Sequence, residues 1–200
     1  MPTFVLASQS PARLATLRSA GVEPVVVVSG VDESVADGLA PADLAQRLAE
    51  LKCAAVADRS DVPADGLVLG CDSVLEVDGQ ALGKPGDAAT ATARWHAMRG
   101  RSGVLHSGHC LRDVATGREA RATGSTTVHF ADVTDAEVAA YVATGEPLQV
   151  AGAFTLDGLG GAFVTGIEGD PHTVVGVSLP LLRTMVAELG HSWTGLWAGR

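Results

Sequence analysis

The chain has 200 residues, of which 46% are hydrophobic and 18% are charged, and its formal net charge at pH 7 is −9. This apolar content can bury a core that offsets the entropy of ordering, which excludes wholesale disorder and predicts one compact domain over residues 1–200. The acidic balance opposes binding to a nucleic-acid backbone, although a local basic pocket could still hold a small anion.

The first residues of the chain and its cysteines indicate the cellular compartment of the protein. Residues 1–13 have a short apolar stretch with no basic segment before it, which argues against a secretory signal, and no apolar run approaches bilayer-spanning length. Cys53, Cys71 and Cys110 share no C-x-x-C spacing, which favours buried reduced thiols over a disulfide framework or a structural zinc site. We therefore expect a soluble cytoplasmic protein whose partners include neither a membrane nor a nucleic acid.

The chain begins with a predicted strand, helix and strand. Residues 3–7 and 24–28 are short apolar runs, and the second is typical of a strand covered on both faces. Between them, Ser10 and Pro11 form an N-cap and first-turn pair that opens a helix, which Gly21 ends.

A long helix and a hairpin are predicted next. Apolar residues keep helical spacing over residues 41–58, and residues 67–77 read as a strand. Asp78 and Gly79 are typical of a two-residue hairpin turn, so the chain should double back through residues 80–82.

The second half of the chain continues the alternation. Thr134 and Glu137 form a capping box at the start of a helix that Gly145 closes. Further helices are predicted from Asp87 to Met98 and from Ser178 or Pro180 to Leu189, and further strands at residues 104–112 and 123–130. Together these elements predict an α/β fold with a mixed sheet shared between two lobes, and a loosely ordered tail at residues 191–200.

Hydroxyl side chains and an arginine surround the first helix start. Ser8 and Ser10 precede Arg13, and a helix N-terminus offers unpaired N–H groups and a partial positive charge that suit a phosphate. Arg13 could add a bidentate contact. Taken alone, the pattern more simply indicates a helix cap and a solvated arginine.

Two carboxylates follow apolar strands. Asp72 and Ser73 stand where the strand at residues 67–77 acquires polar side chains, and a carboxylate there could bind a metal or take a proton from water. Glu33 could be a second ligand, because magnesium commonly uses one or two carboxylates plus substrate phosphates. An Asx turn at Asp72 and a solvated turn residue at Glu33 are the simpler readings of each residue alone.

Two lysines complete the candidate set. Lys84 lies just after the predicted hairpin, and Lys52 directly follows Leu51 on the apolar side of the long helix. An ammonium group can neutralise a phosphate oxygen or the charge that develops on departing pyrophosphate. Most lysines are solvated surface residues, so neither indicates a site by itself.

These fragments together resemble the Maf family of nucleotide pyrophosphatases. In the first half the likeness is carried, in order, by Leu6-Ala-Ser-Gln-Ser-Pro-Ala-Arg13, Val31-Asp-Glu33, Arg47-Leu-Ala-Glu-Leu-Lys52, and Asp72-Ser-Val with Gly83-Lys-Pro85. In the second half it is carried by Tyr141-Val-Ala-Thr-Gly-Glu-Pro147, by Ala151-Gly-Ala-Phe-Thr-Leu-Asp-Gly-Leu-Gly160, and by Ile167-Glu-Gly-Asp170 through Val175-Gly176. Each motif is weak alone, but the ordered set is specific and spans nearly the whole chain.

The resemblance implies an elongated, twisted mixed sheet flanked by helices, with a cleft between two lobes, as in Maf and ITPase-like proteins. It implies hydrolysis of a nucleoside triphosphate to the monophosphate and pyrophosphate with a divalent cation such as magnesium or manganese. Homodimer formation is plausible on the same ground. The implied roles are catalysis by Asp72, Lys52 and Lys84, phosphate binding by Ser8, Ser10 and Arg13, and metal binding by Glu33 and Asp72.

Three positions depart from the commonest family pattern. Ala12 stands where an arginine often follows Ser-Pro, Ser73 replaces a threonine, and Asp157 replaces a glutamine. The three are candidates for setting substrate specificity. Ser73 keeps the hydroxyl, whereas Ala12 and Asp157 put the identity of the nucleobase in doubt and leave the reaction type intact.

Two other functions remain open on the sequence. One is a regulator of cell division that binds a nucleotide without turning it over, and the other is a metal-dependent phosphatase that releases orthophosphate. The retained acid and lysines argue against a binding protein without activity. Release of pyrophosphate would indicate a pyrophosphatase, release of orthophosphate a phosphatase, and binding without either product a regulator.

Overall fold

A seven-stranded mixed sheet organises the computed structural model, which describes residues 2–32 and 38–198. The strands are β1 (Thr3–Leu6), β2 (Val25–Val26), β3 (Gly66–Val77), β4 (Gln80–Leu82), β5 (Ser102–Asp113), β6 (Glu119–Phe130) and β7 (Val164–Glu168). Their order is β2-β1-β3-β5-β6-β7, with β4 paired to β3. β1 runs parallel to β2 and β3, and the other pairs are antiparallel. The predicted mixed α/β sheet is therefore confirmed.

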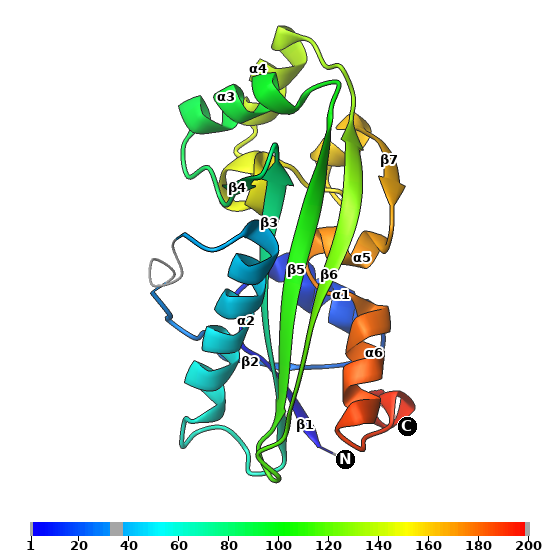
Figure 1. The fold of residues 1–200 in the computed structure, drawn as a ribbon. Helices are drawn as coiled ribbons and strands as arrows, with labels where there is room; N and C mark the ends of the chain where they lie inside the picture. The colour runs from blue at the N-terminus through cyan, green and yellow to red at the C-terminus, as the bar shows by residue number, and fades with distance from the viewer. Residues whose placement is uncertain (1, 33–37, 199–200) are drawn as a thin grey trace.

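Helices cover both faces of this sheet. They are α1 (Pro11–Ser19), α2 (Pro41–Ala57), α3 (Ala88–Met98), α4 (Asp135–Ala143), α5 (Pro171–Val175) and α6 (Leu179–Glu188). Short 3-10 turns lie between α4 and β7 and after α6. The long strands β3, β5 and β6 give the molecule its elongated shape, with α3 and α4 at one end (Figure 1).

Local signals explain where the elements begin and turn. The Ser10 side chain accepts a hydrogen bond from Arg13 N at 3.4 Å and caps α1 as predicted. Asp78 and Gly79 both have positive φ, at 52° and 75°, as the tight turn between β3 and β4 requires. The capping box of α4 is also present, because Thr134 and Glu137 bond each other's backbone N–H groups.

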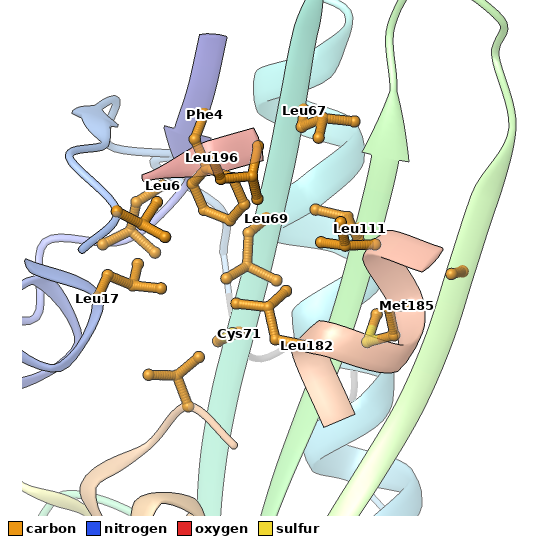
Figure 2. Close-up of a cluster of buried hydrophobic side chains, with 14 of the residues drawn as sticks. Phe4, Leu6, Leu17, Leu67, Leu69, Cys71, Leu111, Leu182, Met185 and Leu196 are labelled. Carbon is orange, nitrogen blue, oxygen red and sulfur yellow. The ribbon is translucent and has the colours of Figure 1, made fainter. Parts of the chain in front are cut away.

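Strand alternation places α2 on one face of the sheet and α1 with α6 on the other. Leu67, Leu69 and Cys71 of β3 belong to a core cluster with residues of α1 and α6, shown in Figure 2. Val68, between them in sequence, packs with Cys53 of α2. Successive strand residues point to opposite faces, so β3 separates these two clusters.

A further core occupies the far end of the long strands. Leu75 and Val77 of β3 pack there with Trp95 of α3 and Tyr141 of α4. Trp95 makes edge-to-face contacts with three other aromatic rings of this cluster and donates from Nε1 to Ala153 O at 2.8 Å. Two lobes thus have separate cores and share the strands that pass through both.

Two expectations from the sequence are wrong, and one strand was missed. The second strand is not covered on both faces: Val25 and Val26 are 49% and 42% exposed, because β2 is an edge strand that pairs with β1 alone. The end of the chain is not loose up to residue 198, since Leu196 is buried and Trp197 forms a β-bridge with Val22. The strand β7 was not anticipated.

Among residues 2–32 and 38–198, no helix is long and apolar enough to cross a membrane.

Helix α2 lies unusually close to the sheet over two glycines. A Cβ atom at Gly70 would lie 2.2 Å from Ala49 O and 2.6 Å from Cys53 N, both backbone atoms of α2. A Cβ atom at Gly108 would lie 2.3 Å from Ala45 O. Any other residue at either position would therefore push the helix backbone off the sheet.

We predict that Gly70→Ala lowers the free energy of unfolding by about 2 kcal/mol or more, because overpacking against backbone cannot be relieved by a rotamer change. Gly195→Ala is the matched control, since a Cβ atom there meets only Ser192 Cβ at 3.6 Å. Denaturant unfolding of both variants measures the difference. Equal midpoints for Gly70→Ala and the unsubstituted protein would contradict the close approach.

Candidate active site

A cleft of about 900 Å³ opens where the two lobes meet. Its lining includes the segments after β1 and β2, the start of α1, one side of α2, the middle of β3, β4 with the residues that follow it, the segment after α4, and parts of β5 and α5. The candidate residues that line it are Ser8, Ser10, Ala12, Arg13, Lys52, Asp72, Ser73, Lys84 and Asp157. Glu33 lies outside the described residues. The structure thus brings together candidates from distant parts of the chain.

Asp72 and Ser73 stand on β3 at the boundary between the two cores. Cys71 still belongs to one core and Leu75 to the other, while both polar residues are half-buried at the cleft. In the pairing of β3 with β5, Asp72 lies opposite Gly108, and Ser73 lies opposite Ser107. The strand β3 therefore carries polar side chains at the point where it passes from one core to the other and borders the cleft.

Lys52 of α2 forms an ion pair with Asp72. Lys52 Nζ lies 2.5 Å from Asp72 Oδ1, and the two side chains are only 11% and 13% exposed. An ion pair shielded from water interacts more strongly than one on the surface, and removal of one partner leaves a poorly solvated charge. The pair fixes one carboxylate oxygen of Asp72 within the cleft wall.

Arg13 is buried and joins three segments of the chain. Its Nε donates to Gly176 O at 2.8 Å, Nη1 to Ser8 Oγ at 3.1 Å and Nη2 to Ser73 Oγ at 2.9 Å. A guanidinium has five N–H donors, and these bonds account for three within the described residues. The expectation of a solvated arginine, open on the sequence alone, is wrong.

The hydroxyls of Ser73 and Ser107 form a hydrogen-bonded chain in which each donates in the same direction. Ser107 Oγ donates to Thr173 O at 2.8 Å, so the Ser73 hydroxyl must donate to Ser107 Oγ, 2.7 Å away. Ser73 Oγ in turn accepts from Arg13. The Ser73 proton therefore points toward Ser107, and this hydroxyl supports Arg13 rather than offering a donor to a ligand.

Ser8 has the opposite arrangement. Its Oγ accepts from Ser10 N at 3.2 Å and from Arg13 Nη1 at 3.1 Å. A hydroxyl oxygen has two acceptor sites and one O–H donor. With both acceptor sites engaged, the Ser8 proton is the group that can reach an anion at the N-terminus of α1.

Lys84 and Asp157 occupy exposed parts of the cleft lining. The backbone next to Lys84 is fixed, because Gly83 O accepts from Gly152 N at 3.1 Å. Asp157 lies in a segment whose glycines pack closely against neighbouring atoms: a Cβ atom at Gly160 would lie 2.4 Å from Tyr141 Oη.

His109 is a buried residue beneath the site. Its Nε2 accepts from Ser178 N at 2.9 Å, which assigns the proton of the neutral ring to Nδ1. Burial, reinforced by the positive charge of Arg13, lowers the pKa of His109 to about 4.

Sequence reasoning missed the residues that hold Arg13 in place. Gly176 was noted only as part of a motif, and Ser107 and Thr173 were assigned no role. A polar residue in the middle of the apolar strand at residues 104–112 was the available signal for Ser107. Its partners could not be read from the sequence, because Arg13 and Gly176 are 163 positions apart.

No group of three or more His, Cys, Asp or Glu side chains suited to a metal ion occurs in the described part of the chain. The oxygen ligands that the cleft offers include the carboxylates of Asp72 and Asp157. The three cysteines are buried free thiols, as expected.

A cleft that combines a helix N-terminus, an arginine, lysines and a carboxylate defines a protein that binds and can act on a phosphorylated ligand. The Maf-like protein family model matches residues 3–189, so the chain belongs to the Maf family. The family membership predicted from the sequence is confirmed.

Relatives match over nearly the whole chain. The nucleoside triphosphate pyrophosphatase of Salinispora tropica is 64% identical over 197 residues, which cover 98% of this chain and 87% of the relative. The protein of that name in Streptomyces coelicolor is 60% identical over 195 residues, or 98% of this chain and 94% of the relative. Among solved structures, the Staphylococcus aureus Ham1 protein is 12% identical with a TM-score of 0.44 over 98% of this chain and 93% of that one, a likeness too distant to support a conclusion.

The low pKa of His109 predicts a loss of stability in acid. The unfolded chain takes up a proton near pH 6.5 that the folded ring takes up only near pH 4, so stability is lost as the pH falls between these values. The His109 contribution between pH 7 and pH 5 should be about 2 kcal/mol.

His109→Gln keeps a side-chain acceptor that can meet Ser178 N and removes the titration. Between pH 7 and pH 5, its free energy of unfolding should therefore fall by about 2 kcal/mol less than that of the unsubstituted protein. Denaturant unfolding at both pH values gives the comparison. Parallel pH profiles for the variant and the unsubstituted protein would rule out the His109 contribution.

Proposed function

We propose that this chain is a nucleoside triphosphate pyrophosphatase that hydrolyses an NTP or dNTP to the monophosphate and pyrophosphate. The activity class agrees with the name shared by the relatives at 64% and 60% identity. The observation that carries the location of the chemistry is the Lys52–Asp72 pair, held at 2.5 Å in the wall of the cleft.

Asp72 is the residue that we assign to the attacking water. Lys52 holds Oδ1, so Oδ2 is the oxygen left either to take the water proton or to hold the cation that acidifies the water. The water oxygen forms a bond to the α-phosphorus, and the bond from that phosphorus to the bridging oxygen of the β-phosphate breaks. The products are the nucleoside monophosphate and pyrophosphate.

Positive groups around the cleft bind the triphosphate. We assign the α1 N-terminus with Ser10, the Ser8 hydroxyl and the remaining N–H groups of Arg13 to phosphate oxygens. Lys52 and Lys84 stabilise the charge that develops as pyrophosphate leaves. Because Arg13 is already fixed by three hydrogen bonds, it loses little conformational entropy when a phosphate binds.

The cleft suits a hard divalent cation such as magnesium or manganese. We assign Asp72 as its carboxylate ligand, with Glu33 as the second, because these metals take oxygen ligands from a few carboxylates and from substrate phosphates. When bound, the cation neutralises phosphate oxygens and makes the phosphorus more susceptible to attack.

Asp157 and Ala12 are proposed to influence the choice of base. An ionised aspartate only accepts hydrogen bonds, so Asp157 favours a base edge rich in donors, such as that of guanine, over uracil or thymine. The small side chain of Ala12 leaves space for a modified purine. Guanine-type or modified nucleotides are therefore the expected substrates, ahead of dTTP and UTP.

Asp72→Asn should reduce pyrophosphate release about 100- to 10 000-fold, because an amide cannot take up the water proton. The assay measures pyrophosphate and orthophosphate separately across a panel of canonical and modified nucleoside triphosphates. Asp61→Asn is the matched control, since Asp61 is an exposed carboxylate that pairs with Arg59 on the surface. Circular dichroism of each variant establishes that it is folded.

The products decide between the functions. Orthophosphate as the first product would indicate a phosphatase, and binding without either product would indicate a regulator. Undiminished pyrophosphate release by folded Asp72→Asn protein would falsify the role of Asp72.

Chelation should abolish pyrophosphate release, and added magnesium or manganese should restore it, because the proposed ligands are hard oxygens. The measurement is initial rate after exhaustive dialysis against a chelator, followed by metal titration. Full activity in the dialysed protein would remove the cation from the mechanism.

A further inference from the structure

The Glu146 carboxylate, behind the cleft, accepts hydrogen bonds from Tyr141 of α4 and from three residues of the segment 155–160. Glu146 Oε1 accepts from Tyr141 Oη at 3.0 Å, Thr155 Oγ1 at 2.5 Å and Gly160 N at 3.0 Å. Glu146 Oε2 accepts from Leu159 N at 3.0 Å. Tyr141 Oη also accepts from Thr155 N at 3.2 Å, so the residues that meet the carboxylate are themselves connected.

The backbone of residues 155–160 wraps closely around this carboxylate. A Cβ atom at Gly158 would lie 2.8 Å from Glu146 Oε2, and one at Gly160 would lie 2.4 Å from Tyr141 Oη. Glycine at both positions is what allows the backbone N–H groups to reach the carboxylate oxygens. The glycines of residues 155–160 thus allow this segment to pack around the Glu146 carboxylate.

Hydrogen bonds keep Glu146 ionised. Partial burial alone would raise its pKa, but the bonds from Thr155 and from the N–H groups of Leu159 and Gly160 outweigh burial, and the pKa of Glu146 lies below its usual value. A glutamine at this position would have one acceptor oxygen and one NH₂ group, so at least one donor would face another donor.

The same segment forms part of the cleft wall. Thr155, Leu156 and Asp157 line the cleft, whereas Glu146 lies outside the lining residues. Asp157 is exposed, and hydrogen bonds from Thr155, Leu159 and Gly160 hold the segment to the Glu146 and Tyr141 side chains. The position of this wall therefore depends on a residue that a ligand in the cleft need not touch.

We propose that Glu146 is a positioning residue for substrate selection, because its ionised carboxylate holds residues 155–160 so that Leu156 and Asp157 meet the ligand in one arrangement. A contact that discriminates between similar ligands must be held to within about 0.5 Å. A segment without its acceptor would adapt to several ligands and discriminate less. The inference rests on the proposed function for its choice of ligand.

Glu146→Gln tests the inference through the ratio of kcat/KM for the best and worst substrates among GTP, CTP, UTP and dTTP. We expect this ratio to shrink at least fivefold, mainly through KM, while kcat for the best substrate changes less than threefold. Glu137→Gln is the matched control, because Glu137 is an exposed carboxylate of the α4 capping box. It should leave the ratio unchanged.

Amide hydrogen exchange supplies a second readout that does not depend on turnover. The N–H groups of Leu159 and Gly160 should exchange at least tenfold faster in Glu146→Gln than in Glu137→Gln. Tyr141→Phe keeps the carboxylate but removes one of its donors, so it should shift both readouts in the same direction by less. It also keeps the test decisive if Glu146→Gln does not fold.

The possible outcomes separate this inference from the proposed function. If the unsubstituted protein releases no pyrophosphate, the proposed function fails, and the affinities for the same four nucleotides replace kcat/KM. An unchanged ratio in folded Glu146→Gln, or in Tyr141→Phe where Glu146→Gln is unfolded, would overturn the role of Glu146. An equal change in Glu137→Gln would do the same.

Discussion

The close contact between helix α2 and the sheet is the constraint on which the candidate site depends. Backbone atoms of α2 rest directly over Gly70 and Gly108, where a side chain would displace them. Gly108 lies opposite Asp72 in the β-ladder, so the space above Asp72 is free for the helix to deliver Lys52. An ion pair at 2.5 Å tolerates little displacement. The Lys52–Asp72 pair therefore depends on the absence of a Cβ atom at Gly70 and at Gly108.

The boundary between the two cores explains how polar residues are tolerated on a buried strand. Asp72 is compensated by Lys52 and Ser73 by Arg13, so neither is left without a partner in a poorly solvated position. The hydroxyl chain continues through Ser107 to Thr173 O and couples α1, β3, β5 and α5. One network thus holds Arg13 in place and gives the polar side chains of the strand hydrogen-bond partners.

Features encoded locally could be predicted, and those that depend on tertiary contacts could not. The Ser10 cap and the Asp78-Gly79 turn were recognised because each is a short-range signal. The exposure of Val25 was not, because an apolar run does not reveal whether a strand lies at the edge of a sheet. The cleft residues were identified as an ordered set, yet the role of Gly176 depends on a contact 163 positions away.

The hydrogen bonds of Arg13 and those of Glu146 differ in how much of the fold must be assembled before they can form. The bonds of Arg13 to Ser73 and to Gly176 span 60 and 163 positions, so this arrangement forms only when the sheet and α5 are assembled. The bonds of Glu146 span 5 to 14 positions and lie within one lobe. Substitutions in residues 155–160 can therefore alter a wall of the cleft while the ion pair and the arginine keep their geometry. The hydrogen bonds that shape this wall are therefore local in sequence, whereas those that fix Arg13 depend on the assembled sheet.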